Sequence, residues 1–549
     1  MNTLLEITLS AALREQAATR GGKEFLVFPN RGIRFTFGDV DKKADALAKG
    51  LLAAGFKKGD HIGIWANNVP EWTTVFFAAA RIGVVVVPIN SSYKRNEVEY
   101  VISQADLKGL FIIDRHRDLD YTEMVYQLIP ELKNAEPGDL ISNKFPCLKM
   151  IANIDDTSHA GMYTLKNLLE MGKQIAGGDL NKAESLVHHT DILCIMYTSG
   201  TTGNPKGAML THRSIINNAC HANTMAHVNE DAVVLNPLPL FHIMSLTDGI
   251  IEILLFGAKA IVMENFDPLI CLTAIQKENC TMIYAVPTMY IAMLNHPLFN
   301  TFSTTQLKYG YMGGALCPPE LAKNLIEKMH LEWLSIGYGL TETSPLICNS
   351  FVNDPSDQKL KTIGIPIPGI AVSIRDAENA ECPVNTRGEI CVKGYSVMQG
   401  YYKMEEATGD AIDTNGWFHT GDLGSLLPDG YLVIEGRIKE LIIRGGENVY
   451  PKEVENLLHT MPGIKDVQAV GIPSKKYGEE IGAFIILKEG ASISEKDIVD
   501  FCRDKISFFK IPKYVFFVDS FPITPSGKVQ KFKLSELGLK EVQAKSLAT

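Results

Sequence analysis

The chain has 549 residues, of which 46% are hydrophobic and 21% are charged. A chain of this length and apolar content builds well-buried cores and divides into more than one domain, which excludes a disordered protein. Its 53 Lys and Arg residues are outnumbered by 63 Asp and Glu residues, for a net charge of −10. This balance excludes a general attraction for nucleic acid or an anionic membrane, so an anionic ligand must be bound locally.

The N-terminal segment, residues 1–17, is predicted to form an amphipathic helix. It carries Glu6 and lacks the basic start and the cleavage pattern of a secretory signal. The most apolar stretches, residues 84–89 and 250–262, are too short for a bilayer span or are interrupted by charged residues. The sequence therefore predicts no transmembrane helix.

The ten cysteines are scattered singly along the chain. They form no Cys-x-x-Cys pair, and no His and Cys residues cluster at metal-ligand spacing. We therefore expect reduced thiols, a cytoplasmic protein and no zinc site. The C-terminal Ser-Leu-Ala-Thr is not the peroxisomal tripeptide, so the sequence gives no support for that address.

Short β-branched runs alternate with helical patterns in the first part of the chain. Residues 39–54 are a predicted helix, and the runs at 83–89, 110–113 and 192–196 are predicted strands. This alternation indicates parallel sheets with helical crossovers. Two later strand-like runs, residues 387–393 and 431–435, are separated by Gly, Asp and Asn clusters, which indicates a more antiparallel part of the chain.

After Gly436 a compact segment of about 110 residues begins, a size typical of an independent domain. Its predicted strands and helices mix in an α+β pattern: strands at 441–443, 467–471 and 481–487, and helices at 451–458 and 494–506. The predicted fold class is therefore α/β, with a large N-terminal domain of parallel and mixed sheets, residues 1–437, and a small C-terminal α+β domain, residues 438–549.

Residues 196–207, Met-Tyr-Thr-Ser-Gly-Thr-Thr-Gly-Asn-Pro-Lys-Gly, are the most informative stretch. The loop leaves the end of a predicted strand, where glycines let backbone N–H groups and hydroxyls approach an anion closely. This arrangement favours a polyphosphate site and hence ATP. Lys206 lies between Pro205 and Gly207 and no Ser/Thr follows it, so the P-loop pattern does not fit. A glycine-rich surface turn is the structural alternative for the loop considered alone.

The loop also resembles the signature loop of the adenylate-forming superfamily, which includes acyl-CoA synthetases, nonribosomal adenylation domains and luciferases. Four further motifs of that superfamily follow in order: residues 338–342 (Tyr-Gly-Leu-Thr-Glu), 420–422 (Thr-Gly-Asp), 436–440 (Gly-Arg-Ile-Lys-Glu) and 525–528 (Pro-Ser-Gly-Lys). Five ordered matches identify the chain as a member, although one motif alone would be weak. The sequence differs from the commonest family pattern at Leu316-Cys317, where small residues and proline are common. Asn204 is one of several residues found at its position. Both differences bear on the shape of the pocket rather than on the chemistry.

Membership implies an AMP-forming acid–thiol ligase, an enzyme that converts ATP and a carboxylic acid to acyl-AMP and pyrophosphate and then transfers the acyl group to a thiol. Charge grows on the bridging oxygen and on phosphorus in the first step, so fixed cations and donors are needed there. By resemblance, Lys528 reaches the carboxylate and α-phosphate from the small mobile domain, and Thr341 bonds the α-phosphate. Glu342, with Thr198, holds Mg²⁺ through oxygen ligands.

The resemblance extends the nucleotide site to other residues. Tyr338 offers a face to adenine, and Asp422 and Arg437 form the ribose pair. The implied ATP and AMP site comprises Thr198, Ser199, Gly200, Thr201, Thr202, Gly203, Lys206, Gly314, Ala315, Tyr338, Gly339, Asp422, Arg437 and Lys528.

Three further roles follow from the family pattern. His242 is a gate to the acid pocket, and Lys439 is the hinge whose backbone rotation swings the small domain between half-reactions. After that rotation Arg444, Gly445 and Gly446 face the acyl-AMP and bind CoA. Ordinary structural roles stay open for these residues: His242 as a core residue, Tyr338 as core packing, Asp422 as a turn residue, the glycines as a tight turn and Lys528 as a solvated lysine.

The acid is expected to be a medium- or long-chain fatty acid, with an aryl acid second. The residues expected to line its pocket are apolar, and Asp248, the one candidate partner for an ammonium, lies beyond the core pattern. The lining comprises Ile243, Met244, Leu246, Val286, Met289 and Met312. An apolar surface patch looks like such a pocket in sequence, so weak membrane association stays open.

Four functions remain open at this point. The first is an acyl-CoA synthetase that uses ATP, Mg²⁺, CoA and a small carboxylic acid, with no nucleic-acid partner; no carrier segment follows the small domain, which favours a free thiol acceptor. The second is an acyl-AMP ligase that serves a separate carrier protein, and the third is a luciferase-like oxygenase. The fourth is a non-catalytic acyl-nucleotide binding protein. The oligomeric state is not predicted.

Overall fold

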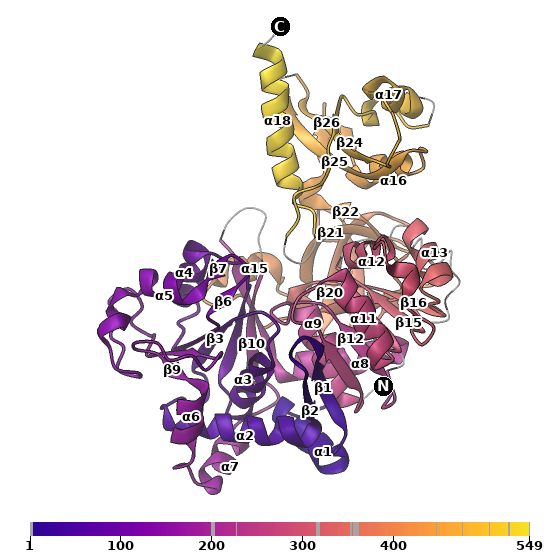
Figure 1. Ribbon diagram of the computed structural model, residues 1–549. Coiled ribbons are helices and arrows are strands. Elements are labelled where there is room, and N and C mark those ends of the chain that lie inside the picture. The colour runs from indigo at the N-terminus through magenta and orange to yellow at the C-terminus, as the bar shows by residue number, and fades with distance from the viewer. Residues whose placement is uncertain are drawn as a thin grey trace. The chain divides into compact units, whose positions relative to one another are not determined.

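The computed structural model describes residues 4–198, 204–226, 228–314, 319–351, 354, 362–445, 447–474, 476–503, 505–524 and 528–547. The chain divides into two compact units (Figure 1). The first comprises Met1–Ala371 with Val392–Phe418, and the second comprises Val372–Cys391 with His419–Thr549.

A nine-stranded sheet, mostly parallel, forms one layer of the first unit. Six neighbouring strands at its centre are parallel, and antiparallel strands flank them on both sides. The order is β18 (Ile365–Pro366), β17 (Leu346–Asn349), β16 (Trp333–Gly339), β15 (Tyr309–Met312), β14 (Met282–Ala285), β12 (Val233–Asn236), β13 (Lys259–Val262), β1 (Glu24–Phe28) and β2 (Ile33–Thr36).

Helices connect these strands, as parallel pairing requires. They are α9 (Ile243–Leu246), the π-turn η3 (Thr247–Ile251), α10 (Glu252–Leu255), α11 (Pro268–Glu278), α12 (Pro287–Leu294) and α13 (Pro319–Lys328). Two further helices, α1 (Leu9–Arg20) and α8 (His212–Ala226), precede β1 and β12 in the chain. The predicted N-terminal helix is therefore present, but it begins at Leu9, where the Thr8 side chain accepts a hydrogen bond from the Ala11 N–H.

A seven-stranded sheet forms the second layer of the same unit. Its order is β11 (Lys206–Thr211), β10 (Ile192–Thr198), β4 (Val85–Ile89), β3 (His61–Trp65), β5 (Gly109–Ile112), β8 (Met150–Asn153) and β9 (Tyr163–Thr164). All neighbours are parallel except β10 and β11. The predicted strands at 83–89, 110–113 and 192–196 are thus confirmed.

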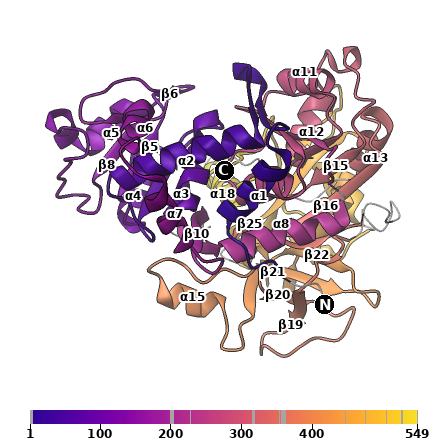
Figure 2. The same ribbon diagram turned by 90° about the horizontal axis from the view of Figure 1, so that it is seen from below.

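Helices accompany the second sheet, and α2 packs against both α3 and α6 (Figure 2). The helices are α2 (Phe37–Ala53), α3 (Pro70–Arg81), α4 (Arg95–Gln104), α5 (Tyr121–Leu128), α6 (Leu165–Gly172) and α7 (Gly177–Ser185), with a small hairpin of β6 (Arg115–His116) and β7 (Leu119–Asp120). The predicted helix at 39–54 starts two residues earlier because Thr36 and Asp39 form a reciprocal capping box.

A four-stranded sheet follows, in the order β19 (Ile370–Arg375), β20 (Gly388–Gly394), β21 (Phe418–Leu426) and β22 (Leu432–Arg437). Helix α15 (Glu405–Ala411) lies between β20 and β21 in the chain. β21 and β22 are antiparallel, as predicted for this part.

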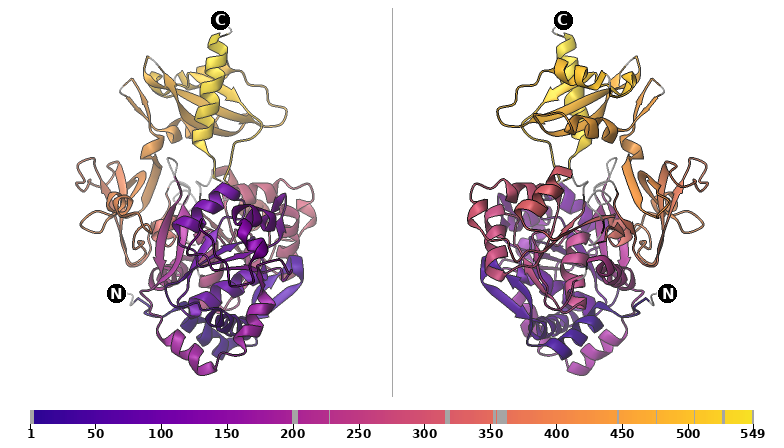
Figure 3. Two further views of the ribbon diagram at one scale, coloured as in Figure 1. Left: turned by 90° about the vertical axis from the view of Figure 1, so that its left-hand side faces the viewer. Right: turned by 90° about the vertical axis from the view of Figure 1, so that its right-hand side faces the viewer.

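The last sheet contains β23 (Ile442–Arg444), β24 (Glu447–Val449), β25 (Ile464–Ser474), β26 (Gly478–Leu487) and β27 (Tyr514–Phe517). Alternate residues of β25 and β26 point to opposite faces. On one face Val467 and Ile481 share a core with α16 (Pro451–His459) and α17 (Glu495–Arg503), and on the other Ile472 packs with α18 (Lys531–Leu547), seen in yellow in Figure 3. The predicted α+β elements after Gly436 are present.

The contact-based division differs from the predicted boundary after residue 437. Contacts group residues 372–391 and 419–437 with the C-terminal elements. The two hydrophobic clusters of the last sheet nevertheless contain only residues from Ile442 onward. In the described residues, no helix is both long and apolar enough to cross a bilayer.

Candidate functional site

Two antiparallel strands flank the glycine-rich stretch. β10 ends at Thr198 and β11 begins at Lys206, and these two residues are paired between the strands. Ser199, Gly200, Thr201, Thr202 and Gly203, all assigned to the nucleotide site, lie outside the described residues. A P-loop would lead into a helix, whereas a strand follows here, so the prediction that this is not a P-loop is confirmed.

Tyr401 connects the loop to the predicted magnesium motif. The Lys206 Nζ lies 4.9 Å from the centre of the Tyr401 ring, and the Tyr401 hydroxyl donates to the Glu342 Oε1 at 2.8 Å. Burial, followed by the Glu342 carboxylate, raises the pKa of Tyr401 well above its usual value, so the hydroxyl remains a donor. Tyr401 thereby contacts both Lys206 and Glu342, which are 136 positions apart in sequence.

The segment that carries Tyr401 is held against β11 by backbone hydrogen bonds. Met209 N–H donates to Gly400 O, and Tyr402 N–H donates to Gly207 O. Met398 N–H donates to Glu342 O at 2.8 Å, which fixes the backbone of Glu342 to the same segment. Sequence reasoning did not identify Tyr401, because its partners come together only in the folded unit.

Thr341 and Glu342 follow directly after the carboxyl end of β16, in the short 3₁₀ turn η5 (Thr341–Thr343). Tyr338 is buried on β16. The next residue, Gly339, lets the backbone of Pro345 approach closely, because a Cβ at position 339 would lie 1.8 Å from Pro345 O. Carboxyl ends of parallel strands form the usual ligand edge of an open sheet.

The neighbouring strands end at the same edge. Gly314 follows β15 in an αL conformation with φ of +79°, while Ala315 lies outside the described residues. β12 leads to His242, whose Nδ1 accepts from Met244 N–H at 3.3 Å and caps α9. The structure thus places His242, Gly314, Thr341 and Glu342 after parallel strands of one sheet.

All six residues expected to line the acid pocket are buried, and Met244 also packs near Gly313. Their neighbour Asp248 is 2% exposed, so the expectation that it lies beyond the core is wrong. The π-turn η3 turns Asp248 inward, next to Glu252 at the start of α10. A π-turn interrupts the regular periodicity of a helix. The apolar pattern of the sequence therefore assigned Asp248 to the wrong side of this segment.

Asp248 and Glu252 form a buried pair of carboxyl groups. Tyr284 donates its hydroxyl to the Glu252 Oε2 at 2.8 Å, but both Asp248 oxygens and the Glu252 Oε1 have no hydrogen-bond partner in the described part of the chain. Burial raises the pKa of Asp248 to about 8, and burial together with Asp248 raises that of Glu252 well above its usual value. The pair is therefore largely protonated at neutral pH.

In the second unit, Asp422 and Arg437 are directly paired across β21 and β22. The Arg437 Nε lies 2.9 Å from the Asp422 Oδ1, and the Asp422 N–H donates to the Thr420 Oγ1 at 3.0 Å. Asp422 is buried whereas Arg437 is exposed. The carboxylate that the resemblance assigns to ribose is thus oriented by a neighbouring guanidinium.

Arg444 makes contacts within the second unit that sequence reasoning did not anticipate. Its Nε lies 2.6 Å from the Glu480 Oε2, and its Nη1 donates to Phe509 O at 2.8 Å. Gly445 has φ of +61° and donates its N–H to Tyr477 O, while Gly446 lies outside the described residues. Two of the three residues assigned to CoA therefore belong to a well-anchored turn.

Lys439 is exposed in the 3₁₀ turn η6 (Ile438–Glu440). Lys528 is also exposed, and residues 525–527, which precede it, lie outside the described part of the chain. Two hydrogen bonds join Lys528 to Thr524: Thr524 N–H donates to Lys528 O at 2.7 Å, and Lys528 N–H donates to the Thr524 Oγ1 at 3.0 Å.

Comparison with known proteins identifies the class. The model of the AMP-binding enzyme family matches residues 13–402, and the model of the AMP-binding enzyme C-terminal domain matches residues 453–528. The chain belongs to the AMP-binding enzyme family, the adenylate-forming ligases, and it is an AMP-forming acid–thiol ligase that uses ATP. The predicted family and fold class are therefore confirmed.

Particular relatives extend over nearly the whole chain. YngI of Bacillus subtilis (strain 168) is 40% identical over 538 residues, which covers 98% of each chain. The mitochondrial medium-chain acyl-CoA ligase ACSF2 of Danio rerio is 36% identical, covering 96% of this chain and 88% of its own. The crystal structure of ATP-bound MatB from Rhodopseudomonas palustris aligns with a TM-score of 0.82 and 26% identity, covering 97% and 99%.

Proposed function

We propose that the protein is an acyl-CoA synthetase for a medium- or long-chain fatty acid. The acid's carboxylate oxygen attacks the α-phosphorus of ATP, the bond to pyrophosphate breaks, and acyl-AMP forms. The deprotonated thiol of CoA then attacks the acyl carbon, a C–S bond forms and AMP leaves. The observation that supports this most is the Lys206–Tyr401–Glu342 connection, which joins the glycine-rich stretch to the acidic residue of the magnesium motif.

The residues that would hold Mg²⁺ are Glu342 and Thr198. A hard cation prefers oxygen ligands, and both side chains supply them. Tyr401 already orients one Glu342 oxygen, Oε1, so the carboxylate does not have to be ordered when the metal binds. When bound, the ion would neutralise charge on the nucleotide phosphates.

The remaining roles are assigned by half-reaction. For the nucleotide we propose Tyr338, Gly339, Gly314 and Thr341, with Asp422 and Arg437 for ribose. Lys528 serves adenylation. The backbone then rotates at Lys439, between domains 1–437 and 438–549. Lys528 leaves the acyl-AMP, and Arg444, Gly445 and Gly446 take its place to bind CoA. Backbone rotation at one exposed turn needs no chemistry from the Lys439 side chain.

A fatty acid is supported by the buried apolar set around Met244 and by the name of the ACSF2 relative, a medium-chain acyl-CoA ligase. Asp248 does not favour an amino acid, since a carboxyl group that is largely protonated attracts an ammonium weakly. We further propose a cytoplasmic protein, because cysteines kept as thiols are usual there and the nine cysteines within the described residues form no disulfide.

Product analysis by mass spectrometry tests this function. The full chain is incubated with ATP, Mg²⁺, CoA and a pool of fatty, aryl and amino acids, and we expect AMP and a fatty acyl-CoA. Acyl-AMP without a thioester would move the acceptor to a carrier protein, and an aryl or amino acyl product would overturn the fatty-acid assignment. Glu342→Gln should lose AMP formation, while the exposed Glu327→Gln serves as the matched control.

A further inference from the structure

Two neighbouring strands of the second unit bring together a glutamate, a cysteine and a histidine. Glu389 and Cys391 are two residues apart on β20, so their side chains share one face, and His419 lies on the adjacent strand β21. The Thr420 hydroxyl donates to Ile390 O at 2.7 Å, which confirms that the two strands lie side by side at this level. No such cluster was expected from the sequence, because Cys391 and His419 are 28 positions apart.

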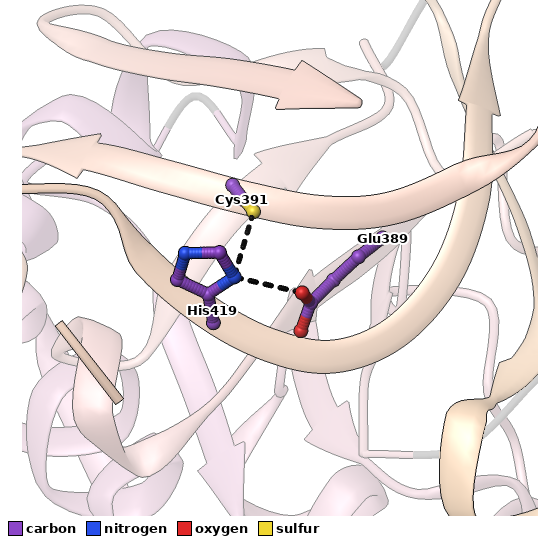
Figure 4. A group of neighbouring side chains, drawn as sticks. All are labelled: Glu389, Cys391 and His419. Carbon is purple, nitrogen blue, oxygen red and sulfur yellow. Dashed lines mark hydrogen bonds and ion pairs between the residues drawn. The ribbon is translucent and has the colours of Figure 1, made fainter. Parts of the chain in front are cut away.

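The three side chains converge on one point (Figure 4). The His419 Nδ1 lies 2.7 Å from the Glu389 Oε2 and 3.4 Å from the Cys391 Sγ. Ligand atoms of all three residues lie within 4.8 Å of one another, and this is the one such group found among the described His, Cys, Asp and Glu residues. Cys391 is fully buried, whereas His419 and Glu389 are each about one-fifth exposed.

We propose that Glu389, Cys391 and His419 bind a divalent cation of the zinc class. A thiolate and an imidazole select such an ion, and a carboxylate can complete three protein ligands with one position left open. The usual zinc bond lengths place tetrahedral ligand atoms about 3.3–3.6 Å apart. The nitrogen–sulfur separation already meets this value, and the nitrogen–oxygen separation must open by about 0.6 Å.

The glutamate is also oriented for this role. Its second oxygen, Oε1, accepts from the Gly421 N–H at 2.9 Å, which leaves Oε2 directed at the histidine. Ligating carboxylates are commonly held by such an outer hydrogen bond. Mg²⁺ prefers oxygen ligands alone, so this site is chemically distinct from that of Glu342 and Thr198.

Binding requires the thiolate form of Cys391. The S–H bond breaks, the proton is released to solvent, and the sulfur electron pair is donated to the metal, so affinity rises with pH. The His419 Nδ1, which faces the Glu389 carboxylate, must also offer a lone pair, so a proton on this nitrogen moves to Nε2 when the metal binds. Because the same glutamate holds the Gly421 N–H, a bound ion would also stiffen the segment from Thr420 to Asp422.

Cobalt(II) titration of the full, metal-free chain tests the proposal. We expect a sulfur-to-cobalt charge-transfer band that saturates at one ion per chain, is abolished by zinc and is unaffected by excess Mg²⁺. Cys391→Ser should remove the band, and His419→Gln should weaken binding at least about tenfold. Cys147→Ser, at an exposed cysteine, is the matched control and should retain it.

Absence of the band in the wild-type protein, or its persistence in Cys391→Ser, would overturn the site. If the variants fail to fold, X-ray absorption of the zinc-loaded wild-type chain replaces them. We expect one sulfur neighbour at about 2.3 Å with nitrogen and oxygen at about 2.0–2.2 Å. A first shell without sulfur would contradict the proposal.

Discussion

Lys528 and Lys531 lie three residues apart, and the fold uses them in opposite ways. Lys528 is exposed, and its backbone is hydrogen-bonded to Thr524. Lys531, at the start of α18, is largely buried, with its Nζ 2.8 Å from Glu455 and 3.3 Å from Glu440. Burial alone would lower the pKa of Lys531, but the two glutamates raise it. A lysine held between two carboxylates stabilises the fold, whereas an exposed one remains accessible to a ligand.

The largest expected effect comes from Lys528→Ala. Adenylation should fall by at least about 10³-fold, since a positioned charge on the transition state is lost. Thioester formation from supplied acyl-AMP should remain, and the melting temperature should not change because the two hydrogen bonds to Thr524 use backbone atoms of residue 528. Separate assays of the two half-reactions measure this, with the exposed Lys533→Ala as control. Equal loss of both half-reactions would contradict the assignment.

Lys531→Met should have the opposite effects on stability and activity: the free energy of unfolding should fall, and adenylation should be retained. It leaves Glu455 and Glu440 without their cation, and removing one partner of a buried ion pair costs about 3 kcal/mol of unfolding free energy. Urea denaturation measures the loss, and Lys533→Met is the matched control. At a temperature where the variant is folded, its rate of adenylation should change little. A loss of adenylation rate without a loss of stability would contradict the structural role of Lys531.

Lys439→Pro tests a third lysine. Lys439 is exposed like Lys528, but its proposed role is that of the hinge between the two domains. Proline restricts φ at the hinge, so thioesterification should fall by about 10²-fold while adenylation persists. The bond from Leu441 N–H to Ile438 O does not use the Lys439 N–H, and the fold should therefore tolerate the change. Single-turnover assays of each half-reaction, with Lys439→Ala as control, measure it. Survival of both half-reactions would remove the hinge assignment.

Asp248 extends the comparison to a buried carboxyl group that lies next to a second carboxyl group, that of Glu252, instead of next to a cation. Its pKa is raised to about 8 in the folded state and is about 3.9 when unfolded. Between these values the folded state binds more protons, so stability falls as pH rises, by up to about 1.4 kcal/mol per pH unit.

Asp248→Asn should remove the part of that slope that Asp248 contributes, while Glu252, whose pKa burial also raises, keeps its own part. Denaturation at pH 5 and at pH 8 measures it, and the exposed Asp410→Asn should behave like the wild-type chain. A stability difference between Asp248→Asn and wild type that is the same at both pH values would show that Asp248 titrates normally.

Sequence reasoning predicted the regular elements well wherever hydrophobic periodicity was uninterrupted. The strands at 110–113 and 481–487 and the helix at 451–458 correspond to β5, β26 and α16. Asp248 was misplaced because a π-turn adds a residue to the helical turn, and the apolar pattern alone does not reveal that change.

The candidate site was predicted less completely than the fold. Glu342, Asp422 and Lys528 could be assigned to the candidate site from the sequence because they lie inside short motifs with local spacing. Tyr401 was missed because its two contacts, Lys206 and Glu342, lie far from it in the chain. The Glu389–Cys391–His419 group was missed for the same reason, since strand pairing rather than sequence spacing creates it.

The sequence by itself determined the family, the order of its motifs and the alternation of strands and helices, because each depends on residues that are close together in the chain. Tertiary structure alone decided which charges are paired, which are buried and which side chains meet. Lys531 between two glutamates, Asp248 beside Glu252 and Tyr401 beside Glu342 all depend on contacts between distant segments. Burial and Coulombic interactions depend on distances in space rather than on spacing in the sequence, so they can be determined only from the folded arrangement of sheets and helices.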